Sequence, residues 1–455
     1  MNYHEACAYL TSAVNFESRL HTLEQNDFSL GAFQKFLADL GNPQNSLRCI
    51  HVAGSKGKGS VCRSVAGILS TSGQRAGLFT SPHLYDVRER IRILTPENAS
   101  GVSGERPEIF SGMIPPERFA QIMGQIRSAR ETSRQQRPVT YFELLTAAAF
   151  LYFQQEEVDW VVLETGLGGR LDATNAALAA ICAITLIDRE HTHILGSSYH
   201  DIIREKAGII KTGTRCVVVG YQQNATRATV EDVCVRQAER AGARICFVQR
   251  DMRVASADAA EGKLSWSVFH QGETYDGMTA GGPAAVENTA LTIGIVRELA
   301  AQGEKIAKSD ILCGIRDAVW PGRMEVLPHD PPVILDAAHT GFSARSLARE
   351  INRRYPLKLK TFILGLGKDK DQQGVLQEFA VLEPRVIITR SAHERAACLD
   401  EQRVKKYLNT EKVEKTMTVK GALERALKRG SEDQIIVISG SLYVVAEARR
   451  LLCGT

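Results

Sequence analysis

Short apolar runs alternate along much of this chain with longer segments in which apolar positions recur at helical spacing. In the amino-terminal part, the runs with the length and composition of buried strands are residues 49–53, 75–79, 159–163, 180–187, 215–219 and 244–248. Helical spacing predicts helices at residues 28–40, 61–72, 117–130, 142–154 and 225–242. This alternation is typical of an α/β fold with a mainly parallel sheet.

Two segments of the amino-terminal part depart from this alternation. Residues 263–278 alternate in polarity like a hairpin with its turn at Gln271-Gly272, and a helix is expected after it at 283–299. Residues 96–113 are rich in Gly, Ser, Glu and Pro, which predicts an excursion over the surface.

A second alternating unit follows Trp320. Its expected strands are residues 332–336, 359–364, 384–389 and 434–439, and its expected helices are residues 343–355, 372–382, 419–428 and 441–452. This pattern predicts a smaller Rossmann-like sheet. Because 455 residues exceed one ordinary core, we expect two domains, 1–319 and 320–455.

Composition narrows the class of protein. Hydrophobic residues make up 44% of the chain and charged residues 24%, as in soluble globular proteins. A net charge of +4 is too small to indicate a nucleic-acid surface, and anionic small-molecule substrates suffice to explain it. The ten cysteines form no C-x-x-C pair, and no apolar run approaches a membrane span. We therefore expect a cytoplasmic monomer that binds neither nucleic acid nor membrane.

The stretch from His51 to Ser60, HVAGSKGKGS, places glycines and a lysine directly after an apolar strand. Such a loop lets backbone amides converge on an anion, with Lys58 reaching the outer phosphates of a nucleotide. It is shorter than the strict Walker pattern, and Ser60 is the hydroxyl available for magnesium. The alternative is a glycine turn with a solvated lysine.

Two further polar segments follow predicted strands. Glu164 ends one strand and opens ETGLGGRLDATN, where a carboxylate suits magnesium, whereas Asp172 and Asn175 are as readily explained as caps of the next turn. His191 follows another strand and is either a ligand or an ordinary loop histidine. Lys206 is a surface lysine, a phosphate clamp or, if carbamylated, a further oxygen ligand.

Ordered motifs cover nearly the whole chain: HVAGSKGKGS, TSPHL at Thr80, ERIRI at Glu89, TYFELLTAAAF at Thr140, ETGLGGRLDATN at Glu164, REKAGI at Arg204, PGRMEV at Pro321, LDAAH at Leu335 and SGSLYVVAEAR at Ser439. Together they resemble the folylpolyglutamate synthase and dihydrofolate synthase family of the Mur ligase superfamily. The resemblance implies a P-loop ATPase domain and a Rossmann-like C-terminal glutamate-ligase domain. It also implies an ATP-dependent ligase that adds L-glutamate to dihydropteroate or reduced folates through an acyl phosphate.

The resemblance further implies residue roles. The ATP-binding residues would be Gly54, Ser55, Lys56, Gly57, Lys58, Gly59, Ser60, Asn288, Arg323 and Asp336. Two magnesium ions would be held by Ser81, Glu164, His191 and a carbamylated Lys206. The residues implied in catalysis are Lys58, Lys206, His191 and Arg323. Substrate would contact Pro82, His83, Tyr141 and Phe142 on the pterin side and His339 and Ser441 on the glutamate side.

Aromatic and basic groups near the pterin-side motifs suit a flat ring that carries carboxylates. Phe79, Tyr85, Tyr141 and Phe142 could pack the ring, and Arg88, Arg90 or Arg92 could bind the carboxylates. Leu144, Leu145 and Phe150 are expected to be ordinary core.

Three positions depart from the family pattern. Lys56 stands where asparagine is usual and adds a charge beside the phosphates, Glu190 replaces an aspartate, and Thr340-Gly341 replaces asparagine and proline. Two alternatives are weighed against this family. Another Mur-type ligase would need a nucleotide-sugar domain before the loop, for which about fifty residues are too few. A non-catalytic relative would have lost the phosphate and metal residues, which are present.

Overall fold

The computed structural model describes residues 1–18, 29–99, 110–133, 137–318, 320–368, 370–393, 396–431 and 433–454. Its contacts divide the chain into two compact units. The first comprises Met1–Ser256, Trp266–Met278 and Pro283–Val319, and the second comprises Ala257–Ser265, Thr279–Gly282 and Trp320–Thr455. The second unit thus takes in two segments that precede the boundary expected at Val319, and the simple division into 1–319 and 320–455 stays a prediction.

A seven-stranded sheet forms the centre of the first unit, with the order β3-β2-β4-β1-β5-β6-β7. In this order its strands are Ile91–Leu94, Ala76–Phe79, Trp160–Glu164, Cys49–Ala53, Ala179–Ile184, Cys216–Val219 and Arg244–Phe247. All neighbours are parallel except β2 and β3. The chain leaves β1 towards β2 on one side and later adds β5 on the other. Ligands gather at the carboxyl ends of strands at such a switch point.

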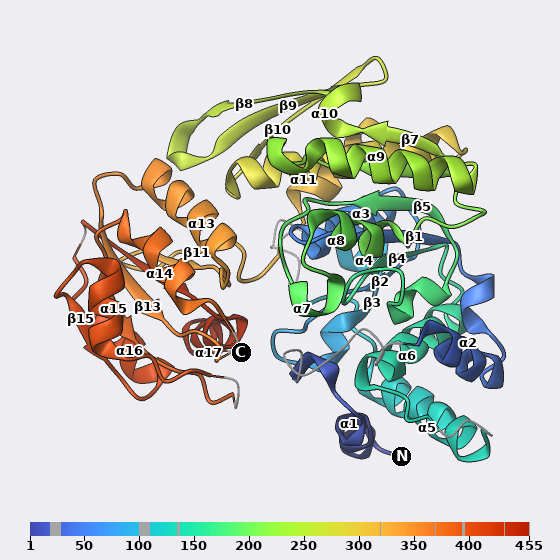
Figure 1. Cartoon of the computed structure of the whole chain (residues 1–455), viewed down its shortest axis with the longest axis horizontal. Coiled ribbons are helices and arrows are strands. Elements are labelled where there is room, and N and C mark those ends of the chain that lie inside the picture. Colours follow the sequence, from blue (N-terminus) through green and yellow to red (C-terminus); the bar gives the residue numbers. More distant parts are fainter. Residues whose placement is uncertain are drawn as a thin grey trace. The chain divides into compact units, whose positions relative to one another are not determined.

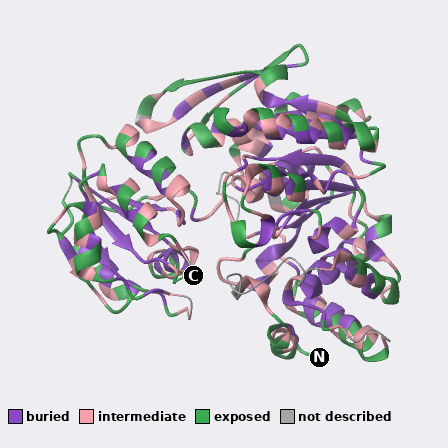
Figure 2. Cartoon of the chain, viewed as in Figure 1, coloured by how far each residue is buried: buried purple, intermediate pink, exposed green. Residues whose placement is uncertain are grey.

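The helices of this unit follow the predicted alternation (Figure 1). They are α1 Tyr3–Ser12, α2 Leu30–Asp39, α3 Lys58–Thr71, α4 Pro96–Ala99, α5 Pro116–Thr132, α6 Tyr141–Gln155, α7 Thr192–Leu195, α8 Tyr199–Ala207, α9 Asn224–Ala241, α10 Val248–Asp251, α11 Gly282–Ala301 and α12 Lys308–Arg316. Every residue of β1 and β4 is buried (Figure 2), as expected for parallel strands covered on both faces. The predicted core residues Leu144, Leu145 and Phe150 are each 0% exposed.

A three-stranded sheet consists of β8 Arg253–Asp258, β9 Leu264–His270 and β10 Glu273–Thr279 in the order β10-β9-β8. The expected hairpin is confirmed, with positive φ at Gln271 and Gly272. Strand β8 was not predicted, because all its residues are exposed and it lacks an apolar face. Of the predicted excursion at 96–113, Pro96–Ala99 is a short helix and residues 100–109 lie outside the described part of the chain.

The second unit contains a six-stranded sheet of order β11-β12-β16-β13-β14-β15, parallel except for β11 and β12. Its strands in this order are Glu325–Leu327, Val333–Leu335, Gln434–Ser439, Leu359–Leu364, Arg385–Ile388 and Val413–Lys415. Its helices are α13 Gly341–Arg354, α14 Gln372–Ala380, α15 Glu401–Leu408, α16 Val419–Lys428 and α17 Leu442–Cys453. Two separate apolar clusters draw on alternate residues of the same strands, so both faces of the sheet are packed.

Candidate active site

The glycine loop leads from β1 directly into α3, which begins at Lys58. Gly57 precedes the helix with a φ of 94°, a left-handed conformation that glycine adopts without steric cost. The helix's first backbone bond runs from the Val61 N–H to the Gly57 carbonyl at 3.0 Å. The amides of residues 58–60 therefore have no acceptor within the helix and, with the helix dipole, form an anion site.

Neighbouring side chains approach this loop so closely that glycine is required at two positions. A Cβ on Gly54 would lie 1.8 Å from Thr185 Oγ1, and one on Gly57 would lie 2.4 Å from Asn288 Oδ1. Asn288 belongs to α11, so the structure brings this expected nucleotide residue against the loop.

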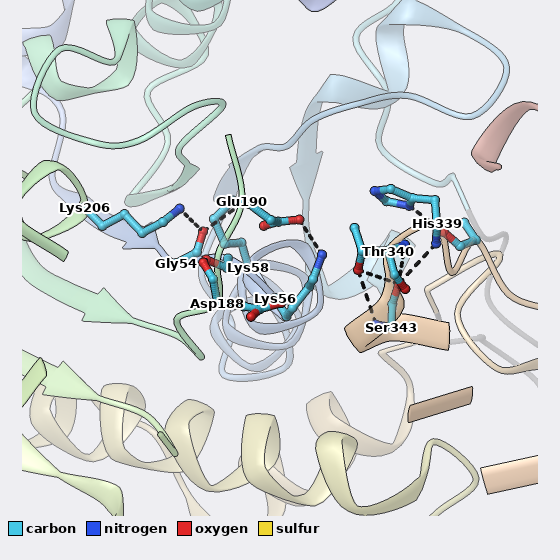
Figure 3. A network of polar contacts seen from close by, with 11 residues as sticks. Gly54, Lys56, Lys58, Asp188, Glu190, Lys206, His339, Thr340 and Ser343 are labelled. Carbon is cyan, nitrogen blue, oxygen red and sulfur yellow. Dashed lines mark hydrogen bonds and ion pairs between the residues drawn. The ribbon is translucent and has the colours of Figure 1, made fainter. Parts of the chain in front are cut away.

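Two lysines from different elements meet at one carbonyl (Figure 3). Lys58 Nζ donates to the Gly54 carbonyl at 3.1 Å, and Lys206 Nζ, from α8, donates to the same oxygen at 2.8 Å. Lys206 is buried, and this burial, followed by the charge of Lys58, lowers the pKa of Lys206 to about 7. The structure thus concentrates positive charge at the anion site, and the Lys206 amine there loses its proton more readily than an ordinary lysine does.

A carboxylate lies among these lysines. Glu190 accepts a hydrogen bond from Lys56 Nζ, and the side chains of Glu190 and Lys56 are 15% and 21% exposed. Burial alone would raise the pKa of Glu190, but the charges of Lys56, Lys58 and Lys206 outweigh it and hold that pKa well below the ordinary value. Glu190 is therefore ionised, and its contact with Lys56 of the phosphate loop was not predicted from the sequence.

Glu164 ends β4 and is 5% exposed. Its Oε2 accepts from the Ser81 backbone N–H at 3.1 Å, so two of the expected metal ligands adjoin. His191 has a left-handed backbone immediately before α7. Within the described ranges, no group of three or more His, Cys, Asp and Glu side chains could hold a metal by itself. These residues fit magnesium that takes its other ligands from phosphates and water, as magnesium usually does.

The segment after Glu164 makes hydrogen bonds that stabilise the residues around the site. Asp172 Oδ1 accepts from the Thr174 N–H at 3.0 Å and caps a short helix, which favours its structural interpretation. Asn175 Nδ2 donates to the Gly208 carbonyl at 3.1 Å, just beyond the last turn of the helix that carries Lys206. Asn175 therefore helps to fix Lys206, which sequence reasoning did not detect because the contact joins residues far apart in the chain.

The arginines expected to bind folate carboxylates are engaged by groups of the protein. Arg88 bonds Asp86, Arg90 bonds both oxygens of Glu17 and also His83, and Arg92 bonds the Ser111 carbonyl. His83 Nδ1 accepts from Arg90 Nε at 2.9 Å, and burial, followed by the Arg90 charge, lowers the pKa of His83 to about 4. His83 is therefore neutral and held in a fixed orientation.

The aromatic residues expected to pack a ring divide into two groups, since Phe79 and Tyr141 are buried whereas Tyr85 and Phe142 are partly buried. Phe79 and Tyr141 are 0% and 6% exposed and belong to the hydrophobic core. Phe142 is partly buried, and its ring occupies the space that a Cβ on Gly166 would need. Pro82 is exposed on the turn after β2. Phe142 and Pro82 are thus better placed than Phe79 or Tyr141 to meet a ligand.

In the second unit, Asp336 lies at the carboxyl end of β12 and accepts from the Met324 and Ala338 amides, both at 2.9 Å. Burial raises the pKa of Asp336, an effect that the charge of the exposed Arg323 opposes. His339 Nδ1 donates to the Ala337 carbonyl at 2.8 Å. The structure thus groups Arg323, Asp336 and His339 at one edge of this sheet.

Comparison with known proteins identifies the second unit first, since residues 322–442 match the Mur ligase, glutamate ligase domain. The dihydrofolate synthase/folylpolyglutamate synthase of Bacillus subtilis is 30% identical over 428 residues, or 93% of this chain and 94% of that protein. The chain belongs to this synthase family. The dihydrofolate synthetase of Saccharomyces cerevisiae is 29% identical over 446 residues, or 93% of this chain and 98% of that protein.

A solved structure of the family agrees with the fold. Mycobacterium tuberculosis folylpolyglutamate synthase complexed with ADP and AMPPCP has a TM-score of 0.79 at 28% identity, over 95% of this chain and 97% of that one. The predicted α/β fold and the class of ATP-dependent ligase are therefore confirmed, and the alternative of a ligase from another branch of the superfamily is set aside.

The departures from the family pattern acquire a structural explanation. Lys56 and Glu190, noted separately in the sequence, contact each other. Thr340 is the N-cap of α13: its Oγ1 accepts from the Ser343 N–H at 3.3 Å, and its own N–H donates to Ser343 Oγ at 3.0 Å. Ser441 caps α17 in the same manner through the Tyr443 N–H at 3.2 Å. At positions 340–341, the hydroxyl cap of Thr340 thus stands in place of the usual amide and proline.

Replacing Thr340 with alanine should lower the stability of the second unit by about 1 kcal/mol, the usual cost of losing an N-cap. Thr340→Ser keeps the hydroxyl and should unfold like the unchanged protein. Urea denaturation followed by a probe in α13 measures both. If Thr340→Ala and Thr340→Ser unfold at the same urea concentration, the hydroxyl is not the cap that stabilises this helix.

Proposed function

We propose that this protein uses ATP to join L-glutamate to folate-type acceptors, namely reduced folates with their polyglutamates and dihydropteroate. One observation carries the proposal: Lys58 and Lys206, from two elements, converge on the Gly54 carbonyl at the amino end of a 14-residue helix. That arrangement suits the outer phosphates of a nucleotide, where charge develops during phosphoryl transfer.

The chemistry follows from the acceptor. A carboxylate in water is a poor electrophile, so amide formation needs activation by ATP. Transfer of the γ-phosphoryl group to a carboxylate oxygen gives an acyl phosphate and ADP, the neutral amine of glutamate attacks the carbonyl carbon, and phosphate leaves from the tetrahedral intermediate. Lys58 and the amides of residues 58–60 hold the phosphates and balance their charge throughout.

Magnesium would shield the phosphate oxygens and draw charge from the transferring group. Glu164 and Ser81 would hold one ion, and His191 with a carbamylated Lys206 would hold a second. The proposal for Glu164 and Ser81 is supported by their contact and by the hard oxygen donors they provide.

The remaining roles follow from the family motifs in which these residues stand. We assign Asn288, Arg323 and Asp336 to the nucleotide, with Arg323 beside the γ-phosphate in catalysis, and His339 and Ser441 to glutamate. For the pterin side we retain Pro82, His83 and Phe142, whereas the 6% exposure of Tyr141 supports a role beneath the ligand rather than against it. 

We also propose a cytoplasmic monomer that binds no nucleic acid and no membrane. The described helices include none that is both long and apolar enough to span a bilayer. All ten cysteines are free thiols, six of them buried, as suits a reducing compartment.

The test measures glutamate-dependent phosphate release from ATP with dihydropteroate, tetrahydrofolate and its diglutamate as separate acceptors. We expect release with reduced folates and with dihydropteroate, and none when glutamate is omitted. If all of these acceptors fail while an unrelated carboxylate supports release, the proposed substrate class is wrong.

A further inference from the structure

Glu190 places a negative charge within a site proposed to bind a polyanion. Its side chain is 15% exposed and accepts a hydrogen bond from Lys56, close to Lys58 and Lys206 (Figure 3). A carboxylate so close to incoming phosphates would repel them, because like charges at short range and low exposure are weakly screened. The site therefore needs a means of cancelling this charge.

Lys56 is the lysine that contacts Glu190. The amides of Ser55 and Lys56 both donate to the Leu186 carbonyl, at 2.9 and 3.1 Å, and Ser55 Oγ donates to the Asp188 carbonyl at 2.9 Å. These bonds fix the first half of the loop to the segment that carries Glu190. They also occupy the amides of residues 55–56, so the anion-facing amides begin beyond them.

The three lysines thus divide into two groups (Figure 3). Lys58 and Lys206 direct their amines to the Gly54 carbonyl, whereas Lys56 directs its amine to Glu190. We propose that Lys56 promotes nucleotide binding by neutralising Glu190 and does not itself hold a phosphate. This inference rests on the proposed nucleotide site. It makes Lys56 a positioning residue, whereas the sequence analysis expected Lys56 to contact ATP directly.

The proposal predicts that the effect of one residue depends on the other. Removing the Lys56 charge alone leaves Glu190 uncompensated and should weaken nucleotide binding. Removing the Glu190 charge alone should leave binding as tight as before or tighter. Removing both charges restores the balance, so the double variant should bind better than the Lys56 variant. If Lys56 contacted phosphate, its removal would instead weaken binding both with and without the Glu190 charge.

The experiment measures the ADP dissociation constant by calorimetry in EDTA, so that metal ligation does not contribute. The near-isosteric variants are Lys56→Met, Glu190→Gln and the double variant, each checked by thermal melting. We expect about tenfold weaker binding for Lys56→Met, equivalent to about 1.4 kcal/mol, and recovery to within about twofold of wild type in the double variant. The Lys56→Met defect should shrink as salt rises.

Arg236→Met is the matched control, since Arg236, in the second half of α9, forms an exposed ion pair with Asp232 at 2.9 Å and should not change ADP binding. The inference is overturned if the double variant binds as weakly as Lys56→Met, if Glu190→Gln weakens binding as much as Lys56→Met does, or if Lys56→Met binds normally. In each case the proposed function survives as long as wild type binds ADP. A wild-type protein that binds ADP neither in EDTA nor with magnesium would overturn the proposed function as well.

Discussion

Replacing Lys58 with alanine is expected to lower the rate of glutamate ligation at least about 100-fold while leaving the fold intact. Lys58 Nζ lies 3.1 Å from the Gly54 carbonyl at the start of α3, where we place the outer phosphates. Charge that develops on a transferring phosphoryl group is stabilised there by a fixed ammonium, and losing one such contact typically costs 10² or more in rate. The side chain is only partly buried, so its removal leaves no large cavity in the core.

Two measurements separate this effect from unfolding. The melting temperature of Lys58→Ala should stay near that of wild type, and phosphate release should fall. Lys35→Ala, on the exposed face of α2, changes a lysine of the same unit without touching the loop and should keep full activity. A Lys58→Ala enzyme that keeps more than about a tenth of the wild-type rate would remove Lys58 from the mechanism.

Local patterns were sufficient to predict the loop, because the strand, the glycines and the following helix are contiguous in the chain. The convergence on Gly54 was not predictable in the same way. Lys206 lies 152 positions from Gly54, and Glu190 lies 134 positions from Lys56. Each was noted in its own motif, but only the pairing of β1 with β5 brings the segments together.

Buried arginines led to two errors in the prediction from sequence. Arg90 and Arg92 are each 2% exposed, and the strand that begins at Ile91 was not predicted because its sequence reads as polar. The sequence could not show that Arg90 bonds Glu17 or that Arg92 bonds the Ser111 carbonyl. Conversely, Phe79 was expected near a ligand ring but lies in the core, since aromatic residues suit both environments.

Short strands at sheet edges were missed for a different reason. β15, Val413–Lys415, has one buried residue, and β11, Glu325–Leu327, has none. Their strand conformation depends on backbone pairing with β14 and β12 rather than on side-chain burial. A pattern of hydrophobic positions carries little information about such strands.

Replacing Lys206 with methionine is expected to abolish ligation and, at the same time, to stabilise the protein. The Lys206 amine is buried and donates to the Gly54 carbonyl at 2.8 Å, beside Lys58. A neutral amine is the form that reacts with carbon dioxide, and a pKa near 7 makes that form abundant at neutral pH. We therefore expect Lys206 to carry a carbamate in the active protein and to supply an oxygen to magnesium.

Carbamylation is measured by carbon-13 NMR of the folded protein in labelled bicarbonate. A single carbamate signal should appear in wild type and be absent in Lys206→Met. Lys211→Met is the matched control, since burial also lowers the pKa of Lys211, but its amine donates to the Asn175 and Ala177 carbonyls rather than to Gly54, so this variant should keep the signal. A carbamate signal that persists in Lys206→Met, or an active Lys206→Met enzyme, would disprove this role.

The stability prediction has a definite dependence on pH. Folding lowers the pKa of Lys206 from 10.5 to about 7, so between these values the unfolded chain binds a proton that the folded protein does not. The resulting destabilisation is largest below pH 7 and disappears as pH rises towards 10.5. In carbon dioxide-free buffer, Lys206→Met should thus melt at a higher temperature than wild type, with the largest gain below pH 7 and a smaller gain at each higher pH. A gain that is independent of pH would mean that the folded protein keeps Lys206 charged, and the buried amine would then be a phosphate clamp rather than a site of carbamylation.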